Sequence, residues 1–425
     1  MAENMRARIF FRRASSLVLI VFLRNALTGA MVSYQLENEE PRIIFSSTPA
    51  VLALIDGEPA LRPAGHNLQM VINTRAIIVF NQATQTYYLA LMDSWVQATA
   101  ENESWFPARN APFKSLHRLR RAAELARRNH VLGNPKQSLK QAYEERKSPT
   151  VYVSSVPTEL ILSEGPPQFT PIIGTSLLYV ENSGNDIFLD SSTQVFYILV
   201  SGRWFKSNSL QKGSWAYVTA ADLPSDFARI PTFSPKASVL ASVPGTLQAR
   251  EALIANQTPH IAAISRSAAK LHLKYDGTPD FQVLEGTHLC YAVNTTTPVI
   301  YIPGSHMYYA VRNAVWFTSG NADGPWTPAT FLPPAIYTIP PSSPIHYVTY
   351  VRVYGYTPTT VYMGYTSGYF GTMVSWDNVV VYGTGWRYPP YVGASEWVPH
   401  PSTYGAGAML SWTAAAGWAL RFRIR

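Results

Sequence analysis

The chain has 425 residues, a formal net charge of +8, 47% hydrophobic residues and only 14% charged residues. This composition excludes a disordered polyelectrolyte, and the length corresponds to roughly three domains, each able to bury a core. The content of 25 Tyr, 18 Phe, 11 Trp, 32 Pro and 25 Gly favours a mainly β protein of short strands and tight turns, and the single cysteine excludes an intrachain disulfide.

Residues 1–40 form a basic and apolar N-terminal arm. Four arginines between positions 6 and 13 precede an apolar run from Leu17 to Leu23, an arrangement typical of an export signal. Arg24 ends that run after seven residues, and a membrane-spanning helix needs about 20, so a transmembrane helix is disfavoured. The arm is either an export signal or a truncated domain, and we expect the cell envelope or the extracellular space rather than the cytoplasm.

One pattern occurs three times, at offsets of 109 and 112 residues. In every copy 15 residues separate an Asn from the second member of an aromatic pair, and 7 more lead to a first Trp. The pattern predicts three small antiparallel β units at residues 41–113, 148–234 and 267–340. Its markers are Asn73, Tyr88, Trp95 and Trp105 in the first unit, Asn182, Tyr197, Trp204 and Trp215 in the second, and Asn294, Tyr309, Trp316 and Trp326 in the third.

Residues 114–147 and 235–266 show helical periodicity with Gly and Pro interruptions, which predicts helical linkers between the units. The first linker is basic, with ten Lys and Arg against three Glu between Lys114 and Lys147. Leu116 and Leu119 recur at helical spacing beneath the arginines, so we expect a solvent-facing helix from Lys114 to Arg128 that packs through these leucines. We expect any binding to nucleic acid to be weak, unspecific and lost in moderate salt.

Each unit contains a β-hairpin with a two-residue turn. The predicted register places Ala90 opposite Trp95, Leu199 opposite Trp204 and Val311 opposite Trp316, and it sorts the side chains onto two faces. One face is apolar in all three units and is predicted to form the core. The other carries a Tyr beside a Trp and is predicted to be exposed; the alternative is that these tryptophans pack between layers, as large aromatic residues usually do.

Residues 341–425 form a Tyr- and Gly-rich β extension and tail. Eleven tyrosines lie between Tyr347 and Tyr404, in short β-prone runs separated by turns that contain Gly.

Tyr308-Tyr309, Trp316-Phe317 and Gly324-Pro325-Trp326 resemble the aromatic core of small chitin-binding carbohydrate modules. Further segments, among them 337–344 and 381–385, are similar to uncharacterised bacterial proteins labelled carbohydrate-binding family V/XII, and this resemblance covers roughly residues 41–400. It implies glycan binding by the Tyr/Trp faces. In the first unit Glu103-Ser104-Trp105 stands in place of Gly-Pro-Trp.

A sugar ring presents a CH-rich face and a rim of hydroxyls, which suits a rigid aromatic ring beside a hydrogen-bonding group. We therefore expect non-catalytic carbohydrate binding in the bacterial envelope or exterior, with a polysaccharide or peptidoglycan glycan as partner and peripheral envelope association. The candidate binding residues are Trp316, Tyr309, Trp204, Tyr197, Trp95 and Tyr88. The alternative is a structural or assembly protein of the envelope that uses the β repeats and the Tyr-rich tail for protein–protein contacts.

The sequence carries no nucleophile elbow, phosphate loop, dinucleotide fingerprint or paired zinc-ligand motif. We therefore expect neither catalysis, nor a cofactor, nor a metal site.

Overall fold

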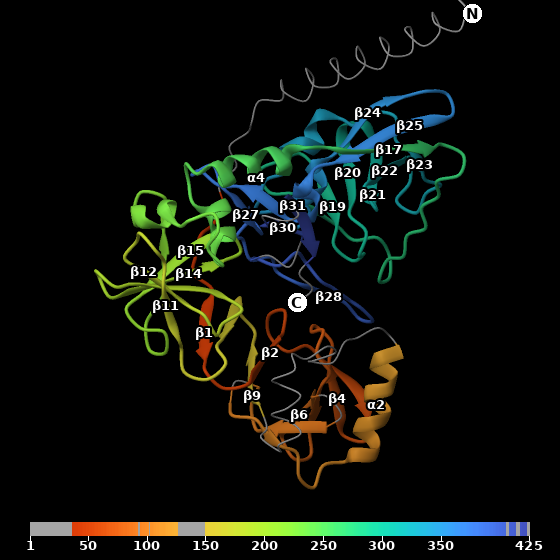
Figure 1. Cartoon of the computed structure of the whole chain (residues 1–425). Helices are drawn as coiled ribbons and strands as arrows, with labels where there is room; N and C mark the ends of the chain where they lie inside the picture. Colours follow the sequence, from red (N-terminus) through yellow and green to blue (C-terminus); the bar gives the residue numbers. More distant parts are fainter. Residues whose placement is uncertain are drawn as a thin grey trace, which may run out of the picture.

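The computed structural model describes residues 36–91, 94–101, 103–125, 149–404, 408–413 and 417–422. The expectations for residues 1–35, for the turn at 92–93 and for residues 126–147 lie outside the described residues. Within them the protein is mainly β, with short antiparallel sheets as its dominant element, as the composition predicts. Figure 1 shows three β units and a C-terminal extension that lies among them.

Each of the three units contains a six-stranded antiparallel sheet in which neighbouring strands follow one another along the chain. Sheet 1 consists of β3 (Leu61–Gly65), β4 (Leu68–Val71), β5 (Ile78–Asn81), β6 (Thr86–Leu91), β7 (Ser94–Ala98) and β8 (Phe106–Pro107). Sheet 2 consists of β11 (Phe169–Pro171), β12 (Leu177–Val180), β13 (Asp186–Asp190), β14 (Val195–Val200), β15 (Arg203–Ser207) and β16 (Ala216–Val218). Sheet 3 consists of β18 (Phe281–Val283), β19 (Cys290–Ala292), β20 (Val299–Ile302), β21 (Met307–Arg312), β22 (Val315–Ser319) and β23 (Thr327–Pro328).

The predicted hairpin register is confirmed in all three sheets: Ala90 lies opposite Trp95, Leu199 opposite Trp204 and Val311 opposite Trp316. The face predicted to be apolar core is also buried in each sheet. Its central pairs are Leu89 with Val96, Ile198 with Phe205, and Ala310 with Phe317. Alternation with period two therefore determined these side-chain directions correctly.

The repeated asparagine holds the turn that precedes each sheet. Asn73 donates from Nδ2 to the carbonyl oxygens of Asp56 and Glu58, each at 2.7 Å, and its Oδ1 accepts from the Ala60 amide at 2.8 Å. Asn182 and Asn294 make the same three kinds of bond in their own turns. One side-chain amide thus satisfies three backbone groups at once, which explains structurally why an Asn occurs at this position in all three units.

The first two units exchange strands. β1 (Arg42–Ser46) pairs in parallel with β10 (Thr158–Leu162), and β2 (Ala50–Leu54) pairs in parallel with β9 (Thr150–Ser154). Ile43 and Phe45 of β1 pack against the core of sheet 2, whereas Val151 and Val153 of β9 belong to the core of sheet 1. Each of these two cores therefore contains residues from before and from after the linker at 114–147.

The described part of the first linker is helix α2 (Phe113–Leu125), in which Leu116 is fully buried and Leu119 is partly buried against sheet 1, as predicted. After sheet 2 come the 3₁₀ helices η1 (Ser225–Arg229) and η2 (Ala237–Ser242) and helix α4 (Leu247–Gln257). The Thr246 hydroxyl caps α4 by accepting from the Ala249 amide at 3.1 Å. Residues 235–266 also contain a strand, β17 (His260–Ser265).

The C-terminal extension is a chain of short strand pairs and 3₁₀ helices. Its 3₁₀ helices are η4 (Pro334–Thr338), η5 (His346–Tyr350) and η6 (Ser367–Phe370), and η3 (Pro303–Ser305) lies within the third unit. Its strands are β24 (Val351–Tyr356) and β25 (Thr360–Tyr365), which complete a three-stranded sheet with β17, followed by β26 (Thr372–Val374) with β27 (Val380–Tyr382), β28 (Tyr391–Val392) with β29 (Trp397–Val398), and β30 (Ala408–Thr413) with β31 (Gly417–Phe422). The predicted β extension is therefore present.

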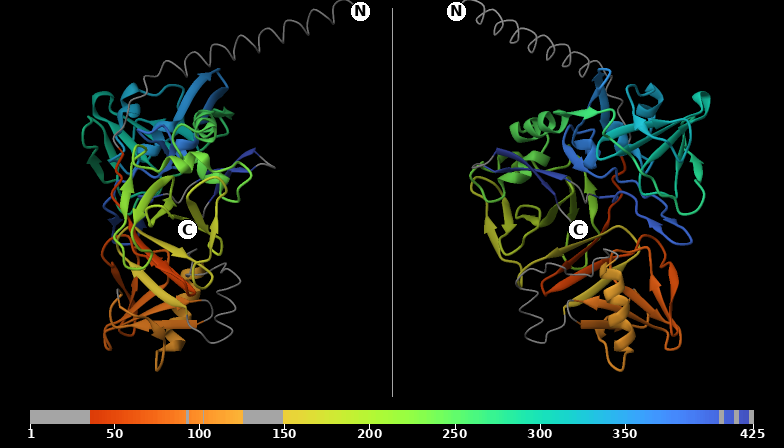
Figure 2. Two further views of the ribbon diagram at one scale, coloured as in Figure 1. Left: turned by 60° about the vertical axis from the view of Figure 1, so that its left-hand side comes forward. Right: turned by 90° about the vertical axis from the view of Figure 1, so that its right-hand side faces the viewer.

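This extension connects the three sheets. The β28–β29 hairpin lies between the turns that precede sheets 1 and 3, where Trp397 Nε1 donates to Asp56 Oδ2 at 2.9 Å and the Ser395 amide donates to Asp276 Oδ2 at 3.3 Å. In the same extension, the Tyr382 amide of β27 donates to the Ser201 carbonyl of sheet 2 at 2.9 Å. Figure 2 shows these blue C-terminal strands among the other units.

Candidate functional site

The face predicted to be an exposed binding platform is buried. Trp95, Trp204 and Trp316 are 3%, 4% and 0% exposed. Their neighbours Tyr88, Tyr197 and Tyr309 are buried as well. The prediction that this face is exposed is therefore wrong, and these six side chains belong to the core.

In the second and third units, the chain that follows the sheet covers this face. Residues 223–243 and 332–351 share Leu-Pro, Ile-Pro and Ser-Pro dipeptides at the same spacing and fold into η1 and η2 and into η4 and η5. Phe227 of η1 lies 4.6 Å from Trp204 between ring centroids, and Ile336 of η4 is buried in the cluster of Trp316. Proline fixes φ in these segments, which suits short 3₁₀ turns better than strands.

The covering segments also satisfy the indole nitrogens of the two tryptophans. Trp204 Nε1 donates to the Ser242 carbonyl at 2.8 Å, and Trp316 Nε1 donates to the Val351 carbonyl at 3.0 Å. A buried indole N–H needs such an acceptor. In the first unit the cover is α2, whose Leu116 packs in the same cluster as Trp95. The repeated Leu-Pro, Ile-Pro and Ser-Pro dipeptides were the sequence signal for this cover.

Among the tryptophans whose side chains the structure describes, Trp376 is the one exposed to solvent, with 68% of its surface accessible. It lies in the turn of the β26–β27 hairpin, outside the repeated pattern that pointed to the other tryptophans. The Asn378 amide donates to the Ser375 carbonyl at 3.0 Å, and Asn378 takes a left-handed conformation with φ of 54°. This tight turn leaves the indole in solvent.

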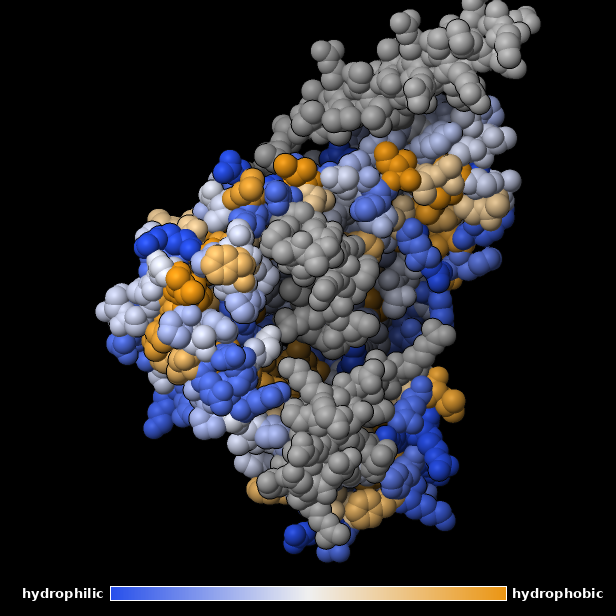
Figure 3. Space-filling view, viewed as in Figure 1, coloured by the Kyte–Doolittle hydropathy of each residue, from blue (hydrophilic) through white to orange (hydrophobic). Residues whose placement is uncertain are grey.

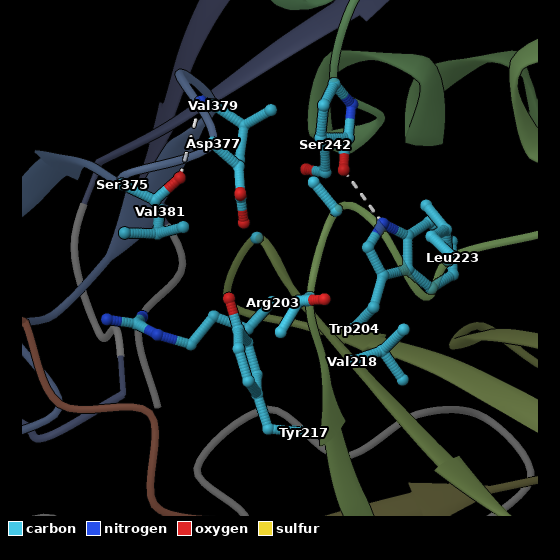
Figure 4. A pocket seen from close by; sticks show the side chains of 14 residues that line it. Arg203, Trp204, Tyr217, Val218, Leu223, Ser242, Ser375, Asp377, Val379 and Val381 are labelled. Atoms are coloured by element: carbon cyan, nitrogen blue, oxygen red, sulfur yellow. Dashed lines mark hydrogen bonds between the residues drawn. The ribbon is translucent and has the colours of Figure 1, made fainter.

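A shallow hollow, open to solvent, lies beside this turn between the β26–β27 hairpin and sheet 2 (Figure 4). Apolar side chains, among them Val218, Val381 and Trp204, line it. The polar residues around it are Tyr217, Thr219, Ser242, Ser375 and Asp377. In Figure 4 the Tyr217 hydroxyl and the Asp377 carboxylate are directed toward one another.

The electrostatics of the hollow come from a phenol and a carboxylate. Partial burial raises the pKa of Tyr217, and the charge of Asp377 raises it further, against an opposing effect of Arg203. Tyr217 is therefore a neutral donor at neutral pH, whereas Asp377 offers acceptor oxygens. Such a pair can bind hydroxyl groups of a ligand.

Arg203 also borders the hollow, but its guanidinium serves the fold. It is almost fully buried and donates to Asn38 Oδ1 at 2.9 Å, to the Tyr382 carbonyl at 2.8 Å and to the Gly383 carbonyl at 3.0 Å. Burial lowers its pKa to about 10, so it stays charged at neutral pH. In Figure 4 its side chain extends away from Asp377 toward the C-terminal extension.

Comparison with protein-family models, with curated proteins and with solved structures finds no match to this chain. In the part of the chain that the structure describes, no group of three or more His, Cys, Asp or Glu side chains could hold a metal ion. Within the same residues, no helix has the length and apolar character that crossing a membrane requires.

Proposed function

We propose that this protein is a non-catalytic glycan-binding protein of the bacterial envelope or exterior, and that Trp376 is its stacking residue. The observation that carries the proposal is the exposed indole of Trp376, whose neighbours in the turn, Ser375 and Asp377, line the hollow that Tyr217 also borders. An indole face suits the CH-rich face of a sugar ring, and the hollow supplies the donor and acceptor for hydroxyls at its rim.

The six residues predicted from the hairpins are not the stacking residues of this proposal, because they are buried; of the six, Trp204 borders the hollow. The second unit still contributes polar side chains to the hollow, namely Tyr217 of β16 and Thr219. The site is thus formed where a repeat unit meets the C-terminal extension, rather than on each repeat separately.

Retention on insoluble chitin, cellulose and peptidoglycan tests the proposal. Trp376→Ala is expected to lose most retention, because stacking area is removed, while the fold is kept because the side chain is exposed. Tyr356→Ala is the matched control, since Tyr356 is an exposed aromatic residue at the end of β24, outside the hollow. Failure of the unmodified chain to bind any of the three, or equal retention of Trp376→Ala and the unmodified chain, contradicts it.

A second candidate function is assembly with further copies of the chain. β17 is an edge strand of its sheet, and five of its six residues are exposed, including Ile261. An unpaired strand edge can add a strand from another molecule. Sedimentation equilibrium decides this candidate: a concentration-dependent dimer that Ile261→Lys abolishes supports it, and a monomer at every concentration removes it.

A further inference from the structure

The outer face of α2 carries a row of basic side chains. Lys114, His117, Arg118 and Arg121 are spaced at i, i+3, i+4 and i+7 and point away from sheet 1. At 100° per residue these four, with Phe113 and Leu125, fall within an arc of about 140° around the helix axis. The opposite side holds Leu116 and Ala123, both buried.

The positive charge of this row is not neutralised within the described residues. The ion pair of α2 joins Arg120 to Glu124 at 2.8 Å, on the flank of the row. No ion pair to Lys114, Arg118 or Arg121 is present in the part of the chain that the structure describes. In the right-hand view of Figure 2 α2 lies on the outside of the first unit, and Figure 3 shows hydrophilic side chains over it.

Exposed apolar side chains flank the basic row. Phe113 at the start of α2 and Leu125 at its described end are both exposed. Phe106 of β8, the strand that precedes α2, is exposed too. Basic residues next to exposed aromatic and aliphatic side chains are typical of surfaces that lie in the headgroup region of a bilayer. A nucleic acid duplex would neutralise the charges but would leave Phe113 and Leu125 without an apolar environment.

We propose that the outer face of α2 is a docking surface for an anionic lipid bilayer. Lys114, Arg118 and Arg121 interact with acidic headgroups, and Phe113 and Leu125 enter the interface. Each basic side chain near an anionic membrane strengthens binding about fivefold, so the three permanent charges together contribute about 100-fold. The proposal is independent of the glycan site, which lies on a different part of the chain.

Co-sedimentation of the full chain with vesicles tests the proposal. We compare binding to two kinds of vesicle at about 0.1 M salt. One kind is pure phosphatidylcholine, and the other contains about one anionic phosphatidylglycerol in three lipids. We expect binding to the anionic vesicles only, with loss at about 1 M salt, where screening reduces the range of the charges to about 3 Å.

The variant K114Q/R118Q/R121Q is expected to reduce the partition coefficient about 100-fold. K212Q/R250Q/K270Q removes the same charge from exposed positions elsewhere and is expected to keep most of the binding. Phe113→Ser separates the two partner classes, because it weakens binding to vesicles but not to a DNA duplex. Equal binding to both kinds of vesicle, or equal losses in the two triple variants, overturns the proposal. Binding of duplex DNA without binding of anionic vesicles overturns it in favour of nucleic acid.

Discussion

Trp316 and Trp376 show how differently the same residue type is used in one chain. Trp316 is fully enclosed in a cluster formed by sheet 3, η4 and η5, and its indole nitrogen is satisfied by the Val351 carbonyl. Trp376 has a short turn beneath it and solvent around it. We therefore expect the Trp316 side chain to contribute strongly to the stability of the fold and the Trp376 side chain to contribute little.

Trp316→Ala is expected to lower the free energy of unfolding by about 3–5 kcal/mol, because the substitution leaves a cavity and an unpaired carbonyl. Trp376→Ala is expected to change it by less than about 0.5 kcal/mol, as for most exposed positions. Urea unfolding followed by circular dichroism measures both. A Trp316→Ala protein as stable as the unmodified chain would be incompatible with the buried position.

His346 makes stability depend on pH. It is 2% exposed in η5, and its Nδ1 lies 2.6 Å from the Ile339 carbonyl, to which it donates. Burial lowers its pKa to about 4, against an ordinary value of 6.5, with the hydrogen bond as a smaller opposing effect. Between these two values the unfolded chain binds a proton that the folded chain does not bind.

The free energy of unfolding is therefore expected to fall as pH decreases from about 6.5 to about 4, by about 3 kcal/mol in total. His346→Gln keeps a donor for Ile339 but does not titrate, so this part of the pH dependence should disappear. The exposed His288→Gln is the control and should follow the unmodified chain. Urea unfolding at several pH values from about 7 to about 4, which span the interval between the ordinary pKa of 6.5 and the lowered pKa of about 4, makes the comparison.

At the scale of elements, Gly202 in the β14–β15 turn allows the β26–β27 hairpin to lie against sheet 2. Its φ is +79°, and a Cβ there would lie 2.5 Å from the Val380 carbonyl oxygen. Gly165, in the turn before sheet 2, has a φ of +81°, but a Cβ added there would meet no atom within 4 Å. The two glycines therefore share the backbone requirement and differ in what lies beside them.

Gly165→Ala is expected to cost about 1 kcal/mol of stability through its left-handed backbone alone. Gly202→Ala is expected to cost about 1–3 kcal/mol more, because the β26–β27 hairpin must move away from sheet 2. Thermal or urea unfolding of the two variants gives the difference directly. Equal losses would show that the contact at Val380 has no energetic weight.

At the scale of the whole molecule, Arg203 joins three separate parts of the chain. From β15 it reaches Asn38 near the start of the described chain and the carbonyls of Tyr382 and Gly383 at the end of β27, and its guanidinium lies 5.0 Å from the Tyr404 ring centroid. A planar group with five donors can bond all of these partners, which a lysine ammonium cannot do.

Arg203→Lys is therefore expected to cost about 2–4 kcal/mol and to loosen the C-terminal extension before the sheets. Hydrogen exchange should become faster in residues 36–40 and 380–383, while the amides of β21 and β22 stay protected. Arg229→Lys is the control, because Arg229 is an exposed residue paired with Asp226. Unchanged exchange in Arg203→Lys would contradict the linking role.

The sequence by itself determined the local features of this protein: the β class, the hairpins, their register and the apolar core face. These depend on residues a few positions apart, since turn length and period two act within one hairpin. The packing of α2 through Leu116 and Leu119 followed from helical spacing in the same way.

Only the tertiary structure decided which side chains meet solvent. Trp204 is covered by residues 227–243, more than 20 positions further along the chain, and β1 and β9 each complete the core of the other unit. Trp376 became the candidate contact because a hairpin from the C-terminal extension lies against sheet 2 and leaves its turn exposed. Burial depends on which distant segment covers a face, and period and spacing within one hairpin carry no information about that segment.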